Sequence, residues 1–145
     1  MEDGITRYRV TDVVLLSAGD LTALATALEA RGMAVTQRAL DIAETDRMWV
    51  FQVGCEQLPD DDLEAELAMF MAAVESLEPP ERAAWASCSK REFDIAFDCG
   101  IKPGSVRHEL SAGLLSRLVA VGGSLKFTLY SLDPREIPPD DVAAE

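Results

Sequence analysis

The sequence is poor in the residues from which most catalytic and metal sites are built. It has one histidine, His108, and three cysteines, Cys55, Cys88 and Cys99. The cysteines form no CxxC pair and their odd number does not suit a disulfide framework, so neither a zinc site nor a set of disulfides is predicted. The spacings GxSxG, HExxH, GxxxxGKS and GxGxxG are missing as well. Their absence excludes the common patterns of hydrolases, metalloproteases and nucleotide-binding proteins, and no cofactor is predicted.

Basic residues are scarce relative to acidic ones. The chain has 13 Lys and Arg against 26 Asp and Glu, which gives a formal net charge of -13. A field of this sign repels phosphate backbones and anionic lipid surfaces, so neither a nucleic acid nor a membrane surface is expected as a partner. A basic protein partner suits this charge. Solubility alone is the simpler explanation of the same charge.

Long apolar runs are missing too. No stretch approaches the roughly 18 residues that span a bilayer, and Met1-Glu2-Asp3-Gly4 does not resemble a secretory signal. The sequence therefore predicts a cytoplasmic protein. With 145 residues and a hydrophobic fraction of 48%, residues 1–132 are expected to form a single domain. Residues 133–145, rich in proline and acids, are expected to form a frayed tail.

The spacing of the apolar residues predicts alternating strands and helices. Strands are expected over 8–16, 34–40, 48–53, 92–99 and 125–130. Helices are expected to begin near Asp20, Leu58-Pro59-Asp60, Glu81 and Ser111. Amphipathic helices on one side of a sheet would bury all these apolar faces. The predicted fold is α+β, a two-layer sandwich with a mainly antiparallel sheet, helices packed on one face and ferredoxin-like character.

The C-terminal third resembles a known family. The residues that carry the resemblance are the strand 93–99, Glu109-Leu110-Ser111, Leu114-Leu115, Leu118, Gly123, Leu125, Phe127, Leu129 and Tyr130. Together they are similar to the closing signature of the bacterial family called domain of unknown function 4279, and Trp49 in a strand before the long helix is similar to it as well. The resemblance implies a compact bacterial α+β domain. It brings no catalytic residues.

The few candidate catalytic and metal-binding groups have simpler explanations. A mechanism that needs an imidazole base could use only His108, the single histidine. His108 stands in a polar stretch before a helix start and is predicted to be a surface residue. Asp60-Asp61-Asp62 lacks the glycine and the later glutamate of a calcium loop. Negative charge at that position matches the positive end of a helix dipole.

One strand carries a candidate binding face. Glu92, Asp94 and Asp98 alternate with apolar residues and are expected on the wet side of the strand, where like charges favour a neutralising partner. Lys126 and Arg91 are the internal candidates for this neutralisation. The functional interpretation is a docking face for a basic protein.

Three function classes follow from these observations. The first is a non-enzymatic protein-interaction domain of immunity or regulatory type that binds a basic partner. The alternative is a small-ligand-sensing regulatory domain, because 12–19 runs into a helix start whose N–H groups could hold a carboxylate. An enzyme of unknown class ranks third. A homodimer through a sheet edge is also possible, and Tyr8 and Tyr130 mark the strands to inspect.

Overall fold

The computed structural model describes residues 5–54, 62–101 and 105–131, and within them the chain forms five strands and four helices. In chain order the elements are β1 Arg7–Ser17, α1 Thr22–Glu29, β2 Met33–Asp41, β3 Arg47–Val53, α2 Leu63–Glu75, α3 Pro79–Ser87, β4 Lys90–Cys99, α4 Ala112–Ala120 and β5 Ser124–Ser131. The predicted tail, Cys55, Asp60 and Asp61 lie outside the described residues.

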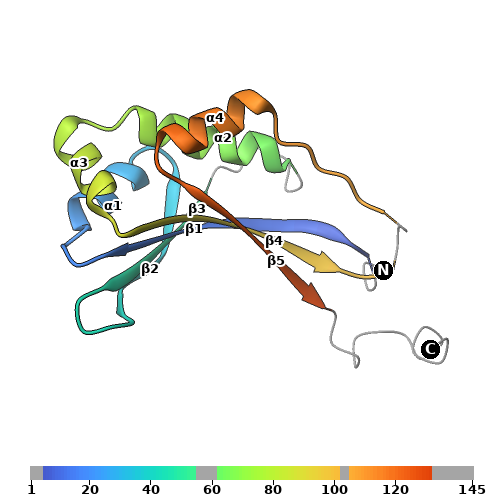
Figure 1. Cartoon of the computed structure of the whole chain (residues 1–145), viewed down its shortest axis with the longest axis horizontal. Helices are drawn as coiled ribbons and strands as arrows, with labels where there is room; N and C mark the ends of the chain where they lie inside the picture. Colours follow the sequence, from blue (N-terminus) through green and yellow to red (C-terminus); the bar gives the residue numbers. More distant parts are fainter. Residues whose placement is uncertain (1–4, 55–61, 102–104, 132–145) are drawn as a thin grey trace.

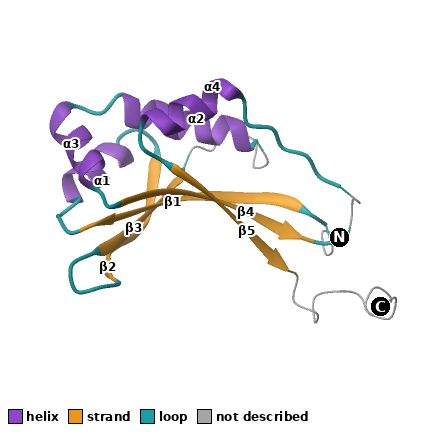
Figure 2. Ribbon diagram, viewed as in Figure 1, coloured by secondary structure: helices purple, strands orange, loops and turns teal. Residues whose placement is uncertain are grey.

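The strands form one sheet in the order β2-β3-β1-β4-β5. Neighbouring strands are antiparallel except for β4 and β5, which are parallel because α4 crosses between them. Figures 1 and 2 show all four helices on one side of the sheet. The predicted two-layer α+β sandwich is therefore confirmed. β3 lies between β1 and β2, as in a split β-α-β unit, while the ferredoxin-like character of the whole fold stays a prediction.

The core lies between the helix layer and the sheet. The apolar residues that repeat at helical spacing along α2 and just after it are all buried, namely Leu63, Leu67, Phe70, Met71, Val74 and Leu77. Phe70 meets the ring of Phe93 from β4 edge-on, with 5.6 Å between the ring centres. Trp85 of α3 packs beside both rings, and its indole N–H donates to the carbonyl of Val121 at 2.8 Å. This aromatic cluster joins α2, α3 and the end of α4 to the sheet.

Helix starts follow local chemistry with small shifts from the prediction. Asp62 is the N-cap of α2, and its carboxylate accepts a hydrogen bond from the N–H of Ala65 at 3.0 Å. Ser111 caps α4 in the same way. The cap position of α1 is held by Leu21 rather than Asp20, although Asp20 still accepts from the N–H of Thr22 at 2.9 Å. Proline begins α3, two residues earlier than predicted, since the ring fits the first helical turn.

Strand order corrects one sequence-based expectation. Tyr8 belongs to β1, which is the central strand of the sheet, and its side chain is buried. It therefore does not mark a free edge. Tyr130 belongs to β5, which is an edge strand. No helix within the described residues is long and apolar enough to cross a membrane.

Candidate functional site

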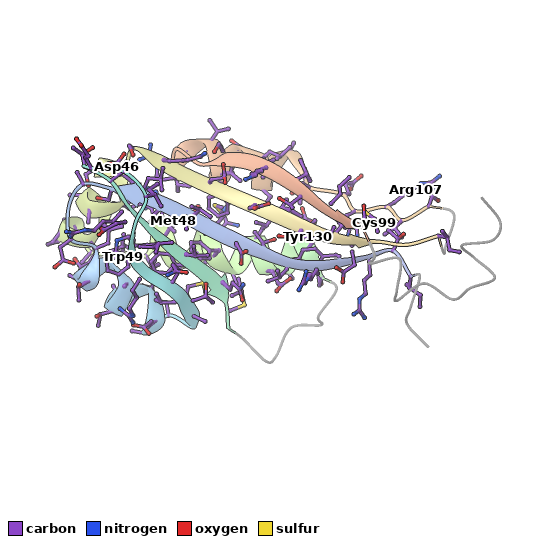
Figure 3. The ribbon with its side chains drawn as sticks, turned by 90° about the horizontal axis from the view of Figure 1, so that it is seen from below. Asp46, Met48, Trp49, Cys99, Arg107 and Tyr130 are labelled. Atoms are coloured by element: carbon purple, nitrogen blue, oxygen red, sulfur yellow. The ribbon has the colours of Figure 1, made fainter. Side chains whose placement is uncertain are left out.

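The predicted acidic face lies on the side of the sheet that the helices leave bare, here called the open face (Figure 3). Glu92, Asp94 and Asp98 all project to this side of β4. They are less exposed than a wet strand face would be, since Glu92 is only 9% exposed and the two aspartates are half-buried. The cause is the position of β4, which has neighbours on both sides.

Each of these three carboxylates has a partner within the chain. Glu92 lies 3.0 Å from the ammonium of Lys90 and 3.7 Å from that of Lys126. Asp94 accepts a hydrogen bond from the hydroxyl of Thr128 at 2.6 Å. The third pairing involves Asp98, whose carboxylate lies 3.8 Å from Arg7 and 3.7 Å from Arg9.

The internal neutralisation is partly the predicted one. Lys126 does reach Glu92. Arg91 does not, because its guanidinium donates to the backbone carbonyls of Cys88 at 2.6 Å and Gly122 at 3.0 Å. It thereby ties the start of β4 to the turn before β5. The acidic face is thus a network of paired charges rather than a bare negative stripe.

Carboxylates of the helix layer also serve the fold. Glu64 of α2 accepts from the backbone N–H of Ser111 at 2.7 Å, and this bond holds the pKa of Glu64 below its ordinary value. Glu75 takes two hydrogen bonds from Arg117 of α4, at 2.7 and 3.0 Å, which lower the pKa of Glu75 in the same way. Much of the acidity of the chain therefore has a structural account.

The single histidine is exposed, as predicted, but it is not isolated. The imidazole of His108 packs against the rings of Phe97 and Tyr8, with ring centres 5.3 and 5.9 Å apart. Burial raises the pKa of the Tyr8 hydroxyl, which shares a hydrogen bond of 2.8 Å with Thr11. The imidazole therefore covers the rings of Tyr8 and Phe97 at the edge of the core. Among the described residues, no hydrogen bond joins the imidazole to a serine or a cysteine.

Cys88 and the start of α1 offer little chemistry. Burial raises the pKa of the Cys88 thiol to about 11, so this group stays protonated at neutral pH. The turn before α1 was the predicted anion site of a ligand sensor. Its first helical N–H and the hydroxyl of Thr22 already bond to Asp20, whose pKa these bonds lower.

A groove of about 580 Å³ lies between α2 and α4. Its lining residues are Asp62, Glu64, Ala65, Ala68, Ser111, Gly113, Leu114 and Arg117. The charged groups among them are used within the protein, since Arg117 holds Glu75, Glu64 holds the N–H of Ser111, and Asp62 caps α2. The groove therefore presents small apolar side chains and already satisfied polar ones.

The most unusual surface lies on β5. Two exposed apolar side chains of this strand, Phe127 and Leu129, define what is here called the β5 surface. On α4, Leu115 and Val119 are exposed as well. Phe127 is 57% exposed, Leu129 65% and Val119 72%. Phe127 lies beside Ile95 and Leu129 beside Phe97 in the sheet, so both face the helix side. No helix covers them, because β5 runs away from the helix layer toward its C-terminal end (Figure 1).

The two edges of the sheet differ. β2 is irregular, with register shifts between Val35 and Gln37 and between Gln37 and Leu40, and with Ala39 in the left-handed region at φ 47°. Such bulges protect an edge against pairing with another strand. β5 pairs with β4 over its whole length without a shift, has no proline, and Lys126 is its one charged residue. Among the residues that the structure describes, β5 is therefore an unprotected edge with an apolar flank.

No family model, curated protein or solved structure matches this chain. The resemblance to the domain of unknown function 4279 family accordingly stays a prediction.

Proposed function

We propose that this chain is a non-enzymatic protein-interaction domain that associates through the β5 surface. The observation that carries the proposal is the regular, exposed edge of β5 with Phe127 and Leu129 uncovered beside it. Soluble proteins normally blunt such edges with charges, prolines or bulges, as β2 does here. An edge left open and apolar is the surface that strand addition uses.

The expected energetics suit a reversible contact. An added strand would satisfy the outward N–H and C=O groups of β5 and cover its apolar flank. Full burial of a Phe or Leu side chain contributes about 1.5–3 kcal/mol relative to an exposed one. Two such side chains contribute about 3–6 kcal/mol together, and the main-chain hydrogen bonds must supply the rest of what offsets the loss of translational freedom. The favourable and unfavourable contributions are of similar size, so a single strand contact is expected to be reversible.

Affinity capture with the full chain tests the proposal. Phe127→Asp places a charge on the β5 surface, and Leu40→Asp makes the same change on the β2 edge, where the side chain is 42% exposed. Proteins from the host extract retained by the wild type and by Leu40→Asp, and lost with Phe127→Asp, are the expected result. Equal recovery with both variants contradicts the proposal. So does a capture in which none of the three retains a host protein or a further copy of this chain.

A basic partner is the second form of this proposal, favoured by the net charge of -13. Recognition by charge weakens as salt screens it, over a Debye length of about 8 Å at physiological ionic strength. Apolar strand addition does not weaken when salt is added. Capture that fails at high salt and is indifferent to Phe127→Asp would therefore support the acidic face of Glu92, Asp94 and Asp98 in place of the β5 surface.

A further inference from the structure

We infer that the occupant of the β5 surface is a second copy of this chain, whose β5 pairs antiparallel with the first about a two-fold axis at Thr128. The inference rests on the proposed use of β5 as the interaction edge and names the partner. The two sheets would join into one continuous sheet, with the helices of both copies on the same side.

The sequence of β5 is complementary to itself in this register. A two-fold axis at Thr128 places Phe127 opposite Leu129 of the second copy, and Leu129 opposite its Phe127. All four side chains then lie on the helix side, where each is largely exposed in the single chain. Directly opposed side chains on one face of an antiparallel pair contact each other, so the two Phe–Leu pairs would cover apolar surface that is exposed in the single chain.

The open face is complementary in the same register. Lys126 lies opposite Tyr130 of the second copy, so the charged residue of β5 meets a ring rather than its own like charge. The ring of Tyr130 already accepts a cation in the single chain, since the guanidinium of Arg9 lies 5.2 Å from its centre. Lys126 keeps Glu92 as a counter-ion.

The contrast between the edges explains why such pairing would stop at two copies. A sheet with two open edges would add strands without limit. Here the bulges of β2 and the strained Ala39 block the other edge, so pairing β5 with β5 leaves only β2 edges at the two ends. A closed two-fold dimer follows.

The charge distribution permits this contact although the whole chain is acidic. In residues 105–131, Arg107, Arg117 and Lys126 are basic and Glu109 alone is acidic. The surfaces that meet therefore carry little of the negative charge. The remaining repulsion between two chains of net charge -13 is long-range and is screened by salt, so added salt should strengthen the dimer or leave it unchanged.

Sedimentation equilibrium of the full chain over a concentration series tests the dimer. The expected mass rises from 15.7 kDa to twice that value. Phe127→Asp should weaken the dimer at least about tenfold, because two charges would be buried against apolar side chains. Leu40→Asp should leave it unchanged. Leu129→Asp repeats the test, and circular dichroism verifies that each variant is folded.

A wild-type mass of 15.7 kDa at every concentration overturns the inference. So does a dimer that survives both β5 substitutions, or one that dissociates as salt is raised.

Disulfide trapping tests the register. In a Cys55→Ser, Cys99→Ser background, Thr128→Cys should oxidise to a covalent dimer, because the two residues face each other across the axis. Lys126→Cys should not, because the register places it opposite position 130. Trapping at 126 and not at 128 refutes this pairing.

The two proposals fail in different ways. A monomeric chain that still captures host proteins through Phe127 removes the second copy and keeps the interaction surface. A dimer indifferent to Phe127→Asp removes the pairing of β5 with β5, and capture of host proteins that is also indifferent to Phe127→Asp removes the interaction surface as well.

Discussion

Trp49 and Trp85 are both buried in the core, but their indole N–H groups have different environments. Nε1 of Trp85 donates to the carbonyl of Val121, whereas Nε1 of Trp49 has no hydrogen-bond partner among the residues that the structure describes. A buried donor without an acceptor contributes an unfavourable desolvation term, and a satisfied one does not. The two tryptophans therefore form a natural pair for measuring one buried hydrogen bond.

Trp85→Phe is expected to lower the free energy of unfolding more than Trp49→Phe does. Both changes remove similar ring volume, but only the first leaves the carbonyl of Val121 unsatisfied, a difference of about 1–3 kcal/mol. Urea unfolding followed by circular dichroism measures both values. Equal losses, or a larger loss for Trp49→Phe, would show that the hydrogen bond to Val121 adds nothing.

At the scale of elements, the turn between α4 and β5 holds the edge strand against the core. A Cβ on Gly123 would lie 2.7 Å from Cε1 of Phe93, whose ring is fully buried. Gly113, in the first turn of α4, has no atom within 4 Å of the same position. A side chain at Gly123 would therefore collide with the core, whereas a side chain at Gly113 would extend into open space.

Gly123→Ala should destabilise the protein by about 1–3 kcal/mol, because the ring of Phe93 must shift in a close-packed core. Gly113→Ala should instead add up to about 1 kcal/mol, since alanine favours the helix. Thermal or urea unfolding of both variants measures the difference. A stable Gly123→Ala variant would mean that the turn yields easily and that β5 is not held where the structure places it.

The link between α2 and α4 depends on pH. The backbone N–H of Ser111 lowers the pKa of Glu64 in the folded protein below its ordinary 4.5. A depressed carboxyl pKa contributes stability that is present above the unfolded value and is lost as pH falls through the folded value. The difference in unfolding free energy between wild type and Glu64→Gln should therefore be largest above about pH 4.5 and should shrink toward pH 3.

Glu78→Gln is the matched control, because Glu78 occupies the N-cap of α3 without a side-chain hydrogen bond to that helix. A Glu64→Gln difference that grows on acidification has the wrong sign for this link.

Local periodicity predicted most of the helices and strands. It did not predict which residues of the strands are exposed, because that depends on the order of the strands in the sheet. The alternation of 92–99 and the stripe from Leu63 to Leu77 gave the buried faces of β4 and α2, because burial of these faces depends on neighbouring residues in sequence. Glu92 is nearly buried, and Phe127 and Leu129 are exposed, because β4 is interior and β5 is an edge. Whether a strand is interior or at an edge depends on pairings between segments that are distant in sequence, which local periodicity does not report.

One signal of a further contact was present in the sequence. α4 carries apolar residues on two sides, Leu114 and Leu118 toward the core and Leu115 and Val119 away from it. A helix on the surface of a monomer normally has a single apolar stripe. The second pair therefore indicates that α4 has an apolar side that the described residues leave exposed.

At the scale of the whole molecule, many acidic side chains of the described residues serve as helix caps, as links between helices or as members of ion pairs. The acidic strand Glu92, Asp94 and Asp98 is balanced by lysine, arginine and hydroxyl groups. The exposed apolar side chains of β5 have no comparable partner among the described residues. The interaction proposed for this chain is therefore carried by exposed apolar surface and free backbone groups rather than by net charge.

Backbone amide hydrogen exchange at dilute and at concentrated protein tests this claim most directly, because it reports each strand edge separately. The account predicts slower exchange within Ser124–Ser131 at high concentration and unchanged exchange within Met33–Asp41. Exchange in β5 that is independent of concentration, or new protection in β2 instead, would contradict it.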